Sequence, residues 1–339
     1  MTPVLTIQRA NPLEYSESLK SLFAANEMEA LIPRFDATSS ELVRSGGACW
    51  IGLDDGGRVQ LHVTLVRKDF AFRGRTIRAG TLGNLVASRK YRCLFPAASL
   101  LGQLVRDVSN DTLLDFLYSD PPPASAAVAK TAGLKQLAAM DRFVIPLNDD
   151  RSSRALAARA YVAVLRLRAG AHAASCTTIE SAHYDLTCGG VGVTPSNRLQ
   201  PYHPDSMYRR RLRGYPGPDY TWCEFRLPGH QQSSKPDAIA LMYGPNELHV
   251  AHVLTIRRAP AVPLWPLTPG LMRAARERGA HRLQIETIRE STFARELQRA
   301  GFRNRDDLLP ILGTAVTPLG DEVVNAVDDW EITALDMER

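Results

Sequence analysis

The residues whose types and spacing could do chemistry are concentrated in one segment, Leu82–Leu101 (LGNLVASRKYRCLFPAASLL). It consists of an apolar strand, a turn with three basic residues, and a helical pattern in which Pro96 suits the first turn. A helix that follows a strand in this way leaves free backbone N–H groups at its positive end. An anionic phosphate is the natural ligand there, and Arg92 would add a charge-assisted contact. A strand–helix connection without a ligand fits the same residues equally well.

Within this segment, Val86–Leu101 resembles the acyl-CoA-binding turn of the GNAT superfamily, in which an aromatic–arginine pair precedes a glycine-rich loop and a helix. Tyr91 and Arg92 take the place of the pair. Phe95 and Ala97 fall where the loop glycines usually sit. Ala97 is an accepted variant of the pattern, whereas Phe95 is a departure, because a side chain there would crowd the pyrophosphate.

The following segment, Asp111–Leu134, is similar to the next strand and helix of the family, so the resemblance covers most of residues 1–147. It implies an acyl-CoA, acetyl or short-chain, as co-substrate, and no metal. The residues implied to bind this co-substrate are Leu85, Val86, Ala87, Arg92, Phe95, Pro96, Ala97 and Ala98.

Acyl transfer to an amine needs a neutral nucleophile, a polarised thioester carbonyl and a proton for the departing thiolate. Backbone N–H groups near Leu85–Ala87 would polarise the carbonyl. Tyr118 is a candidate acid, although an ordinary strand aromatic fits it somewhat better; the family's usual tyrosine lies in the next helix, which has none here. Asn84 and Asp120 would orient or deprotonate the amine. His62 fits a base and a strand histidine equally well.

The elements that must position these residues fall into two similar halves. A strand–helix–strand–helix–strand pattern over residues 82–147 recurs over residues 249–315. The second helix of each ends alike, at Gly133-Leu134 and Gly301-Phe302, with the two glycines 168 residues apart. Each glycine is expected to take the left-handed conformation that ends helices. The pattern predicts a mixed α/β (α+β) fold with two lobes, each a mixed, mostly antiparallel sheet flanked by helices.

The expected elements can be placed along the chain. The strands are predicted at Val4–Arg9, Cys49–Leu53, Val59–Lys68, Thr76–Ala87, Thr112–Tyr118, Phe143–Leu147, His249–Ile256, Arg282–Ile288 and from Leu309. The helices are predicted at Pro12–Ala25, Ser39–Val43, from Pro96, at Ala124–Thr131, from Thr268 to Gly279 and at Ser291–Arg299. We expect a first lobe at 1–148 that binds acyl-CoA, a connecting helix or linker at 149–174, and a second lobe at 175–339 that binds the acceptor.

The second half resembles the C-terminal part of tandem GNAT proteins often found with surface-polysaccharide genes. Three pieces carry this resemblance: His183-Tyr184-Asp185, the run from Ser206 to Arg210 with Tyr215-Pro216 and Tyr220, and Trp330–Asp336. It implies an N-acyltransferase acting on a nucleotide-linked amino sugar. The residues expected to bind this acceptor are Tyr208, Arg209, Arg210, His252 and Trp330. The basic run Arg209–Arg213 fits a diphosphate site and a solvated helix equally well.

The strand–helix junction of the second half, Thr255–Thr268, is long and contains three prolines. It therefore lacks a compact turn that could cradle a phosphate, and we expect only the first lobe to bind CoA. His249 and His252 do not predict a metal site, because residues three apart on a strand face opposite sides.

The composition of the chain limits the kinds of partner that it is expected to bind. The net charge of +5 favours anionic partners, among them nucleic acid, a nucleotide sugar and CoA. No apolar run reaches the roughly 18 residues of a membrane span, and the N-terminus does not resemble a signal peptide. Five scattered cysteines fit a reducing cytoplasm. We expect a cytoplasmic protein with a small-molecule amine as acceptor and no membrane partner; nucleic acid is disfavoured, and a homodimer is compatible with the sequence.

Two other functions stay open from the sequence. A tRNA-dependent aminoacyl transferase of the Fem type is also two-lobed and basic, although the long charged helical hairpin of those proteins is not evident. A non-catalytic binding module is compatible with Phe95 and with the missing family tyrosine.

Overall fold

The computed structural model describes residues 5–111, 113–147, 163–164, 173–180, 197–202, 220–230, 235–258, 261–306 and 308–333. The strands of the first half are β1 (Thr6–Ala10), β2 (Ala48–Leu53), β3 (Val59–Phe72), β4 (Arg75–Ala87), β5 (Phe116–Ser119) and β6 (Lys135–Pro146). Its helices are α1 (Ser16–Ala24), η1 (Glu29–Arg34), α2 (Phe35–Arg44), η2 (Arg89–Tyr91), α3 (Leu94–Asp111) and α4 (Pro123–Thr131).

The second half has the strands β7 (Ser175–Glu180), β8 (Gln200–Tyr202), β9 (Tyr220–Arg226), β10 (Ala238–Tyr243), β11 (Val250–Arg258), β12 (Arg282–Ile288), β13 (Arg303–Asn304) and β14 (Leu309–Ala315). Its described helices are α7 (Thr268–Glu277), α8 (Thr292–Arg299), α9 (Pro318–Val324) and η5 (Val327–Asp329). None of the described helices has the length and hydropathy needed to cross a lipid bilayer.

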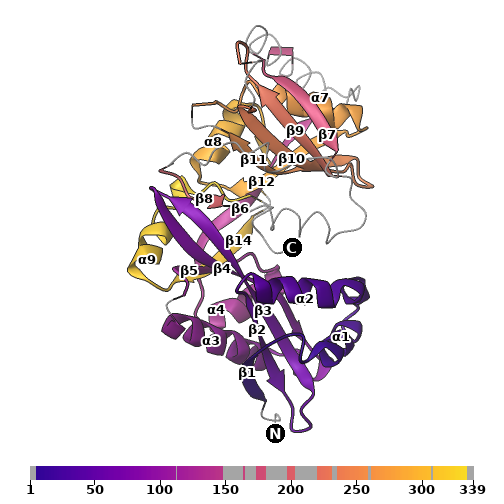
Figure 1. Cartoon of the computed structure of the whole chain (residues 1–339), viewed down its shortest axis with the longest axis vertical. Coiled ribbons are helices and arrows are strands. Elements are labelled where there is room, and N and C mark those ends of the chain that lie inside the picture. Colours follow the sequence, from indigo (N-terminus) through magenta and orange to yellow (C-terminus); the bar gives the residue numbers. More distant parts are fainter. Residues whose placement is uncertain are drawn as a thin grey trace.

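Helices cover both faces of the sheet in the first half (Figure 1). Successive residues of β2 point to opposite faces, and both faces are buried. Trp50 packs in the cluster that α3 and α4 complete with Leu100, Leu104 and Ala129. Its neighbour Ile51 packs in the cluster that α1 and α2 complete.

In the second half, α7 and α8 pack on one face of the sheet, where Leu271 and Phe293 meet strand residues such as Phe225 and Val253. A further cluster covers the middle of the whole sheet. It joins Phe70, Phe116 and Tyr118 of the first half to Ile288, Ile311, Leu199, Trp330 and Ile332 of the second.

The two halves exchange their last strands. The sheet order is β1-β2-β3-β4-β5-β14-β6-β12-β11-β10-β9-β7. Thus β14 lies between β5 and β6 of the first half, and β6 lies between β14 and β12 of the second, all in antiparallel pairs. The strand order is symmetric about the β14–β6 pair, and the described strands form one continuous sheet.

The predicted pattern of elements is confirmed in both halves. Gly133 (φ 98°) and Gly301 (φ 105°) take the left-handed conformation expected after α4 and α8. Ser291 caps α8, its hydroxyl accepting from the N–H of Ala294 at 3.0 Å. The lobe boundaries at 148 and 174 stay predictions, and most of the expected linker lies outside the described residues.

Several elements differ from the prediction. β6 begins at Lys135, directly after Gly133-Leu134, and is far longer than the expected strand at its end. α3 begins at Leu94, so Pro96 lies in its first turn as expected. The strands β9 and β10 and the helix α9 were not predicted. Both strands contain continuous buried runs, whose lack of alternation hides a strand among other apolar segments.

Candidate functional site

The candidate site of the first half begins where β4 and β5 stop pairing. The two strands run parallel and pair at only three positions, the last of which joins Thr81 to Tyr118. β4 continues to Ala87 with β3 as its partner. The carboxyl ends of both strands and the start of α3 therefore lie at one end of this part of the sheet. The Thr81 hydroxyl is fully buried and has no hydrogen-bond partner among the described residues.

A β-bulge interrupts β4 just beyond this point. The register with β3 shifts between His62, opposite Val86, and Thr64, opposite Gly83. Two residues of β4, Asn84 and Leu85, therefore face a single residue of β3. Asn84 has a positive φ of 50°, a conformation that asparagine tolerates better than most residues. A bulge leaves backbone groups out of the strand ladder, so they become available to a ligand.

Two side chains of β3 bind the carbonyl groups of the bulge. The Thr64 hydroxyl donates to Gly83 O at 2.9 Å. His62 Nδ1 lies 3.1 Å from Asn84 O, and since a carbonyl only accepts, the proton is on Nδ1. His62 is 1% exposed and packs edge-on against Phe23. Burial lowers the pKa of His62 to about 4. In this position the imidazole is not accessible to a substrate amine.

After the bulge, the chain forms the basic turn that leads into α3. Arg89 and Lys90 are exposed, as is Arg92, which donates to Asn26 Oδ1 at 2.6 Å. The first turn of α3 is open as well: Leu94 is 38% and Phe95 74% exposed. An α-helix leaves its first N–H groups without helical partners, so this helix start offers donors to an anion beside three basic side chains.

The other predicted residues of this half occupy different environments. Ala97 and Ala98 are buried where α3 packs on the sheet. Val86 packs under α1, and Pro96 is half-buried. Asp120 is half-buried and directly follows β5.

Tyr118 was expected as an acid, but its position corrects this expectation. Its side chain is fully buried, stacked on Phe116 and edge-on to Phe70. This position makes Tyr118 a core aromatic.

The corresponding junction in the second half is closed. β11 and β12 pair up to Val253 and Ile285, and a bulge at Leu254 follows. Beyond that point the C-terminal segment, residues 331–333, lies against β12, where Thr333 pairs with Thr287. The buried Thr287 hydroxyl also donates to Ile332 O at 2.7 Å. The C-terminal segment thus lies beside β12 in the position that β11 occupies before its bulge.

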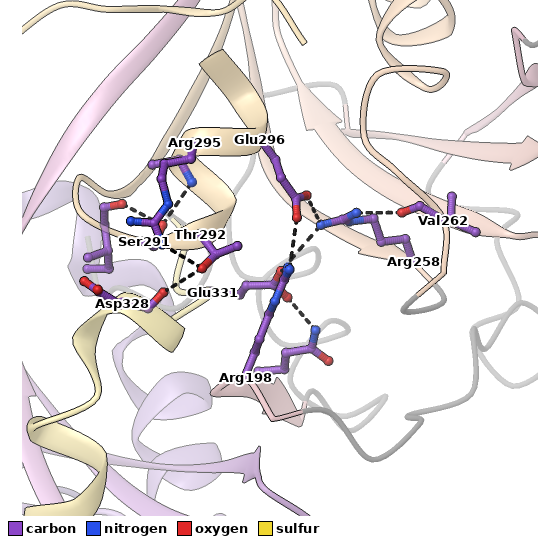
Figure 2. Close-up of polar contacts among 12 residues, drawn as sticks. Arg198, Arg258, Val262, Ser291, Thr292, Arg295, Glu296, Asp328 and Glu331 are labelled. Atoms are coloured by element: carbon purple, nitrogen blue, oxygen red, sulfur yellow. Dashed lines mark hydrogen bonds and ion pairs between the residues drawn. The ribbon is translucent and has the colours of Figure 1, made fainter. Parts of the chain in front are cut away.

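An ion-pair cluster lies beside this segment (Figure 2). Arg258, the last residue of β11, pairs with Glu296 of α8 and lies 3.6 Å from Glu331. Arg198 binds the same two carboxylates. Arg258 also donates to Val262 O at 2.6 Å, and its side chain is only 10% exposed.

The start of α7 is buried, unlike that of α3. Thr268 is 1% exposed and Leu271 fully buried. The preceding loop contributes Leu264 and Leu267 to the core. A β-carbon on Gly270 would lie 2.7 Å from the β-carbon of Cys176, so the first turn of α7 packs closely on β7.

The predicted acceptor residues are not brought together among the described residues. Tyr208, Arg209 and Arg210 lie outside those residues. His252 of β11 is half-buried and stacks on Tyr243 with ring centroids 4.6 Å apart, and burial lowers its pKa. The prediction for Trp330 is corrected by its position: it is fully buried, and its indole N–H donates to Val323 O at 2.9 Å.

No protein-family model matches this sequence, and no curated protein matches it. Solved structures do match. A conserved protein of unknown function from Enterococcus faecalis V583, described as a probable N-acyltransferase, has a TM-score of 0.65 at 10% identity, covering 92% of this chain and 72% of that one. A GCN5-related N-acetyltransferase from Anabaena variabilis ATCC 29413 has a TM-score of 0.60 at 9% identity, covering 92% and 73%. A tandem GNAT protein from the clavulanic acid biosynthesis pathway has a TM-score of 0.50 at 13% identity, covering 93% and 99%.

The chain has the tandem GNAT fold. Its two GNAT-like lobes share the strand exchange but differ at their junctions, one of which is open at the helix start while the other is filled. Sequence reasoning missed Thr64, Thr81 and the cluster around Arg258. The sequence held no clear signal for Thr64, because polar residues at alternate positions of a strand usually face solvent, whereas both faces of this part of β3 are buried.

Proposed function

We propose that this protein transfers an acyl group from an acyl-CoA to the primary amine of a small anionic acceptor. One observation carries the proposal: the exposed start of α3 lies beside Arg89, Lys90 and Arg92, at the end of a bulged β4. In the second half, the chain's own segment at Thr333 and the buried start of α7 leave no equivalent place among the described residues. This contrast supports acyl-CoA binding in the first half alone.

The proposed chemistry assigns each part of the junction a role. The N–H groups at the start of α3, together with Arg92, bind the pyrophosphate of CoA. A backbone N–H of the bulge polarises the thioester carbonyl. The amine nitrogen attacks the carbonyl carbon, a C–N bond forms, and the C–S bond then breaks. Asp120 accepts the proton lost by the amine. Because Tyr118 is enclosed by aromatic side chains, the thiolate takes its proton from solvent.

For the acceptor we propose a nucleotide-diphospho amino sugar. The basic run Arg209–Arg213 and the net charge of +5 support an acceptor with several negative charges. The likeness to tandem GNAT structures shows the fold only and leaves the acceptor open. A cytoplasmic location and a homodimer also stay predictions.

Release of CoA thiol from acetyl-CoA tests the proposal directly. We expect thiol release in the presence of nucleotide-diphospho amino sugars and none with the corresponding N-acetylated sugars, which lack a free amine. Replacing both Arg209 and Arg210 with alanine should raise the KM for the acceptor and leave CoA affinity unchanged. Acetyl-CoA binding without thiol release across a broad panel of amines would favour a binding module. If the wild type bound tRNA with an affinity that falls steeply with salt, and the double variant lost this binding, the Fem-type function would be favoured.

A further inference from the structure

The backbone carbonyl groups of the β4 bulge are bound by side chains of the neighbouring strand. A β-bulge breaks the ladder, and the carbonyl groups there lose their regular partners in the neighbouring strand. In this protein both carbonyls, Gly83 O and Asn84 O, are instead bound by side chains of β3. We propose that Thr64 and His62 are positioning residues that fix the peptide groups of this bulge and so direct the Leu85 N–H at the acyl carbonyl of the thioester. The inference rests on the proposed acyl-CoA site.

The direction follows from peptide geometry. In a planar trans peptide group the C=O and the N–H point in opposite directions. The carbonyl of Asn84 belongs to the same peptide group as the N–H of Leu85. Since His62 lies on β3 and binds that carbonyl, the group is turned so that its N–H points away from β3. That is the side of β4 that paired with β5 up to Thr81 and has no strand partner beyond it among the described residues.

Both donors are held firmly. Thr64 is 9% and His62 1% exposed, so both donor side chains are buried. The His62 ring packs against Phe23 of α1 with centroids 5.4 Å apart and planes at 75°. Asn84 is kept at a positive φ, a conformation that persists only where the surroundings enforce it. A donor fixed in advance binds a carbonyl without the cost of ordering it.

The test compares two ligands that differ only in the acyl group. The wild-type protein should bind acetyl-CoA more tightly than free CoA, because only the thioester carries the carbonyl. Thr64→Val, which keeps the β-branched shape but removes the hydroxyl, should reduce this preference by about three- to tenfold, as expected for one hydrogen bond. His62→Leu should do the same. Affinity for free CoA should be unchanged in both variants, as measured by calorimetry.

Conservative variants separate positioning from mere folding. Thr64→Ser restores the hydroxyl and His62→Asn places an amide donor near the position of Nδ1, so both should restore the preference for acetyl-CoA. Thr131→Val is the matched control, because the Thr131 hydroxyl also donates to a backbone carbonyl, that of Ala127, but on the exposed side of α4. It should leave both affinities unchanged.

The outcomes distinguish this inference from the proposed function. An unchanged preference in Thr64→Val and His62→Leu would overturn the inference and leave the acyl-CoA site standing. Equal wild-type affinity for acetyl-CoA and CoA would also overturn it, because no carbonyl contact would then exist. A wild-type protein that binds neither ligand would remove the proposed function and the inference together.

Discussion

Thr333 pairs with Thr287 at the place in the second half where β11 has ceased to pair with β12. In the first half the corresponding place lies beyond the Thr81–Tyr118 pair, and no strand takes it among the described residues. Two halves with the same order of elements thus differ at the junction where we propose that the first half binds acyl-CoA. The predictions below follow from this difference and from the contacts that create it.

Arg92→Ala should weaken CoA binding by about 1.5–3 kcal/mol, the range for a hydrogen bond to a charged group. Arg92 is exposed in the turn before α3, and its present partner is the neutral amide of Asn26, so it can turn to an anion at little cost. Calorimetry with CoA measures the effect. Arg106→Ala on the same helix, where the guanidinium contacts Gln103, is the control and should change nothing. Equal affinities for the wild type and Arg92→Ala would remove Arg92 from the site.

The protein should become less stable as the pH falls, and part of this loss of stability should depend on His62. Burial holds the pKa of His62 at about 4, below the 6.5 of an exposed histidine, so the unfolded chain binds a proton before the folded one does. Stability is therefore full above pH 6.5 and is lost as pH falls towards 4. Between pH 7.5 and pH 5 this one group should cost about 2 kcal/mol. Urea unfolding at the two pH values measures the change, and the His62→Leu variant should lack this component. An identical pH dependence in both proteins would contradict the burial of a neutral imidazole.

Arg258→Met should destabilise the protein by about 3 kcal/mol, because it leaves Glu296 and Glu331 largely buried, with Arg198 as their one remaining ion-pair partner among the described residues. Arg44→Met is the control. Arg44 pairs with Glu41 on the surface, with 71% of its side chain exposed, and such a pair contributes less than about 1 kcal/mol. CoA affinity should be unchanged in Arg258→Met, because the cluster lies in the other half. Comparable losses of stability from the two substitutions would show that the cluster does not anchor the C-terminal segment.

A fragment of residues 1–148 should not fold by itself. All pairing partners of β6 described here, β12, β13 and β14, come from the second half, and so does the β14 neighbour of β5. Alone, the fragment would expose the apolar residues of β6, such as Phe143 and Ile145. Circular dichroism and amide spectra should show an unfolded or aggregated chain, and co-expression with residues 149–339 should restore the fold. A cooperatively folded fragment would mean that the exchanged strands are not essential.

The sequence predicts what depends on neighbouring residues. Pro96 in the first turn of α3, Ser291 at the start of α8, and Gly133 and Gly301 at the ends of helices are local signals, and the structure confirms each of these elements. The exchange of β6 and β14 could not be predicted, because it is a choice of partners between segments that are far apart in the sequence, as in the pairs Pro146–Arg282 and Tyr118–Gly313. Either strand would present the same apolar pattern in its own half.

The residues of the candidate site show the same limit of prediction from sequence: local patterns are predicted, and contacts with distant strands are not. The pattern of Leu82–Leu101 predicts a basic turn and a helix start, and the structure has both. Tyr118 and Trp330 are aromatic residues near expected sites, yet only the packing of Phe70 and Phe116 from distant strands shows that they are core residues. His62 could be read as a base until the burial of its ring and the carbonyl it binds were known.

A crystal structure of the protein with bound CoA tests the central claim most directly. The account predicts one CoA per chain, with its pyrophosphate at the N–H groups of Leu94, Phe95 and Ala97, since Pro96 has no N–H, and within hydrogen-bond distance of Arg92. It also predicts that Thr333 stays paired with Thr287 in that complex. A CoA pyrophosphate bound at the start of α7, with the C-terminal segment displaced from β12, would contradict it.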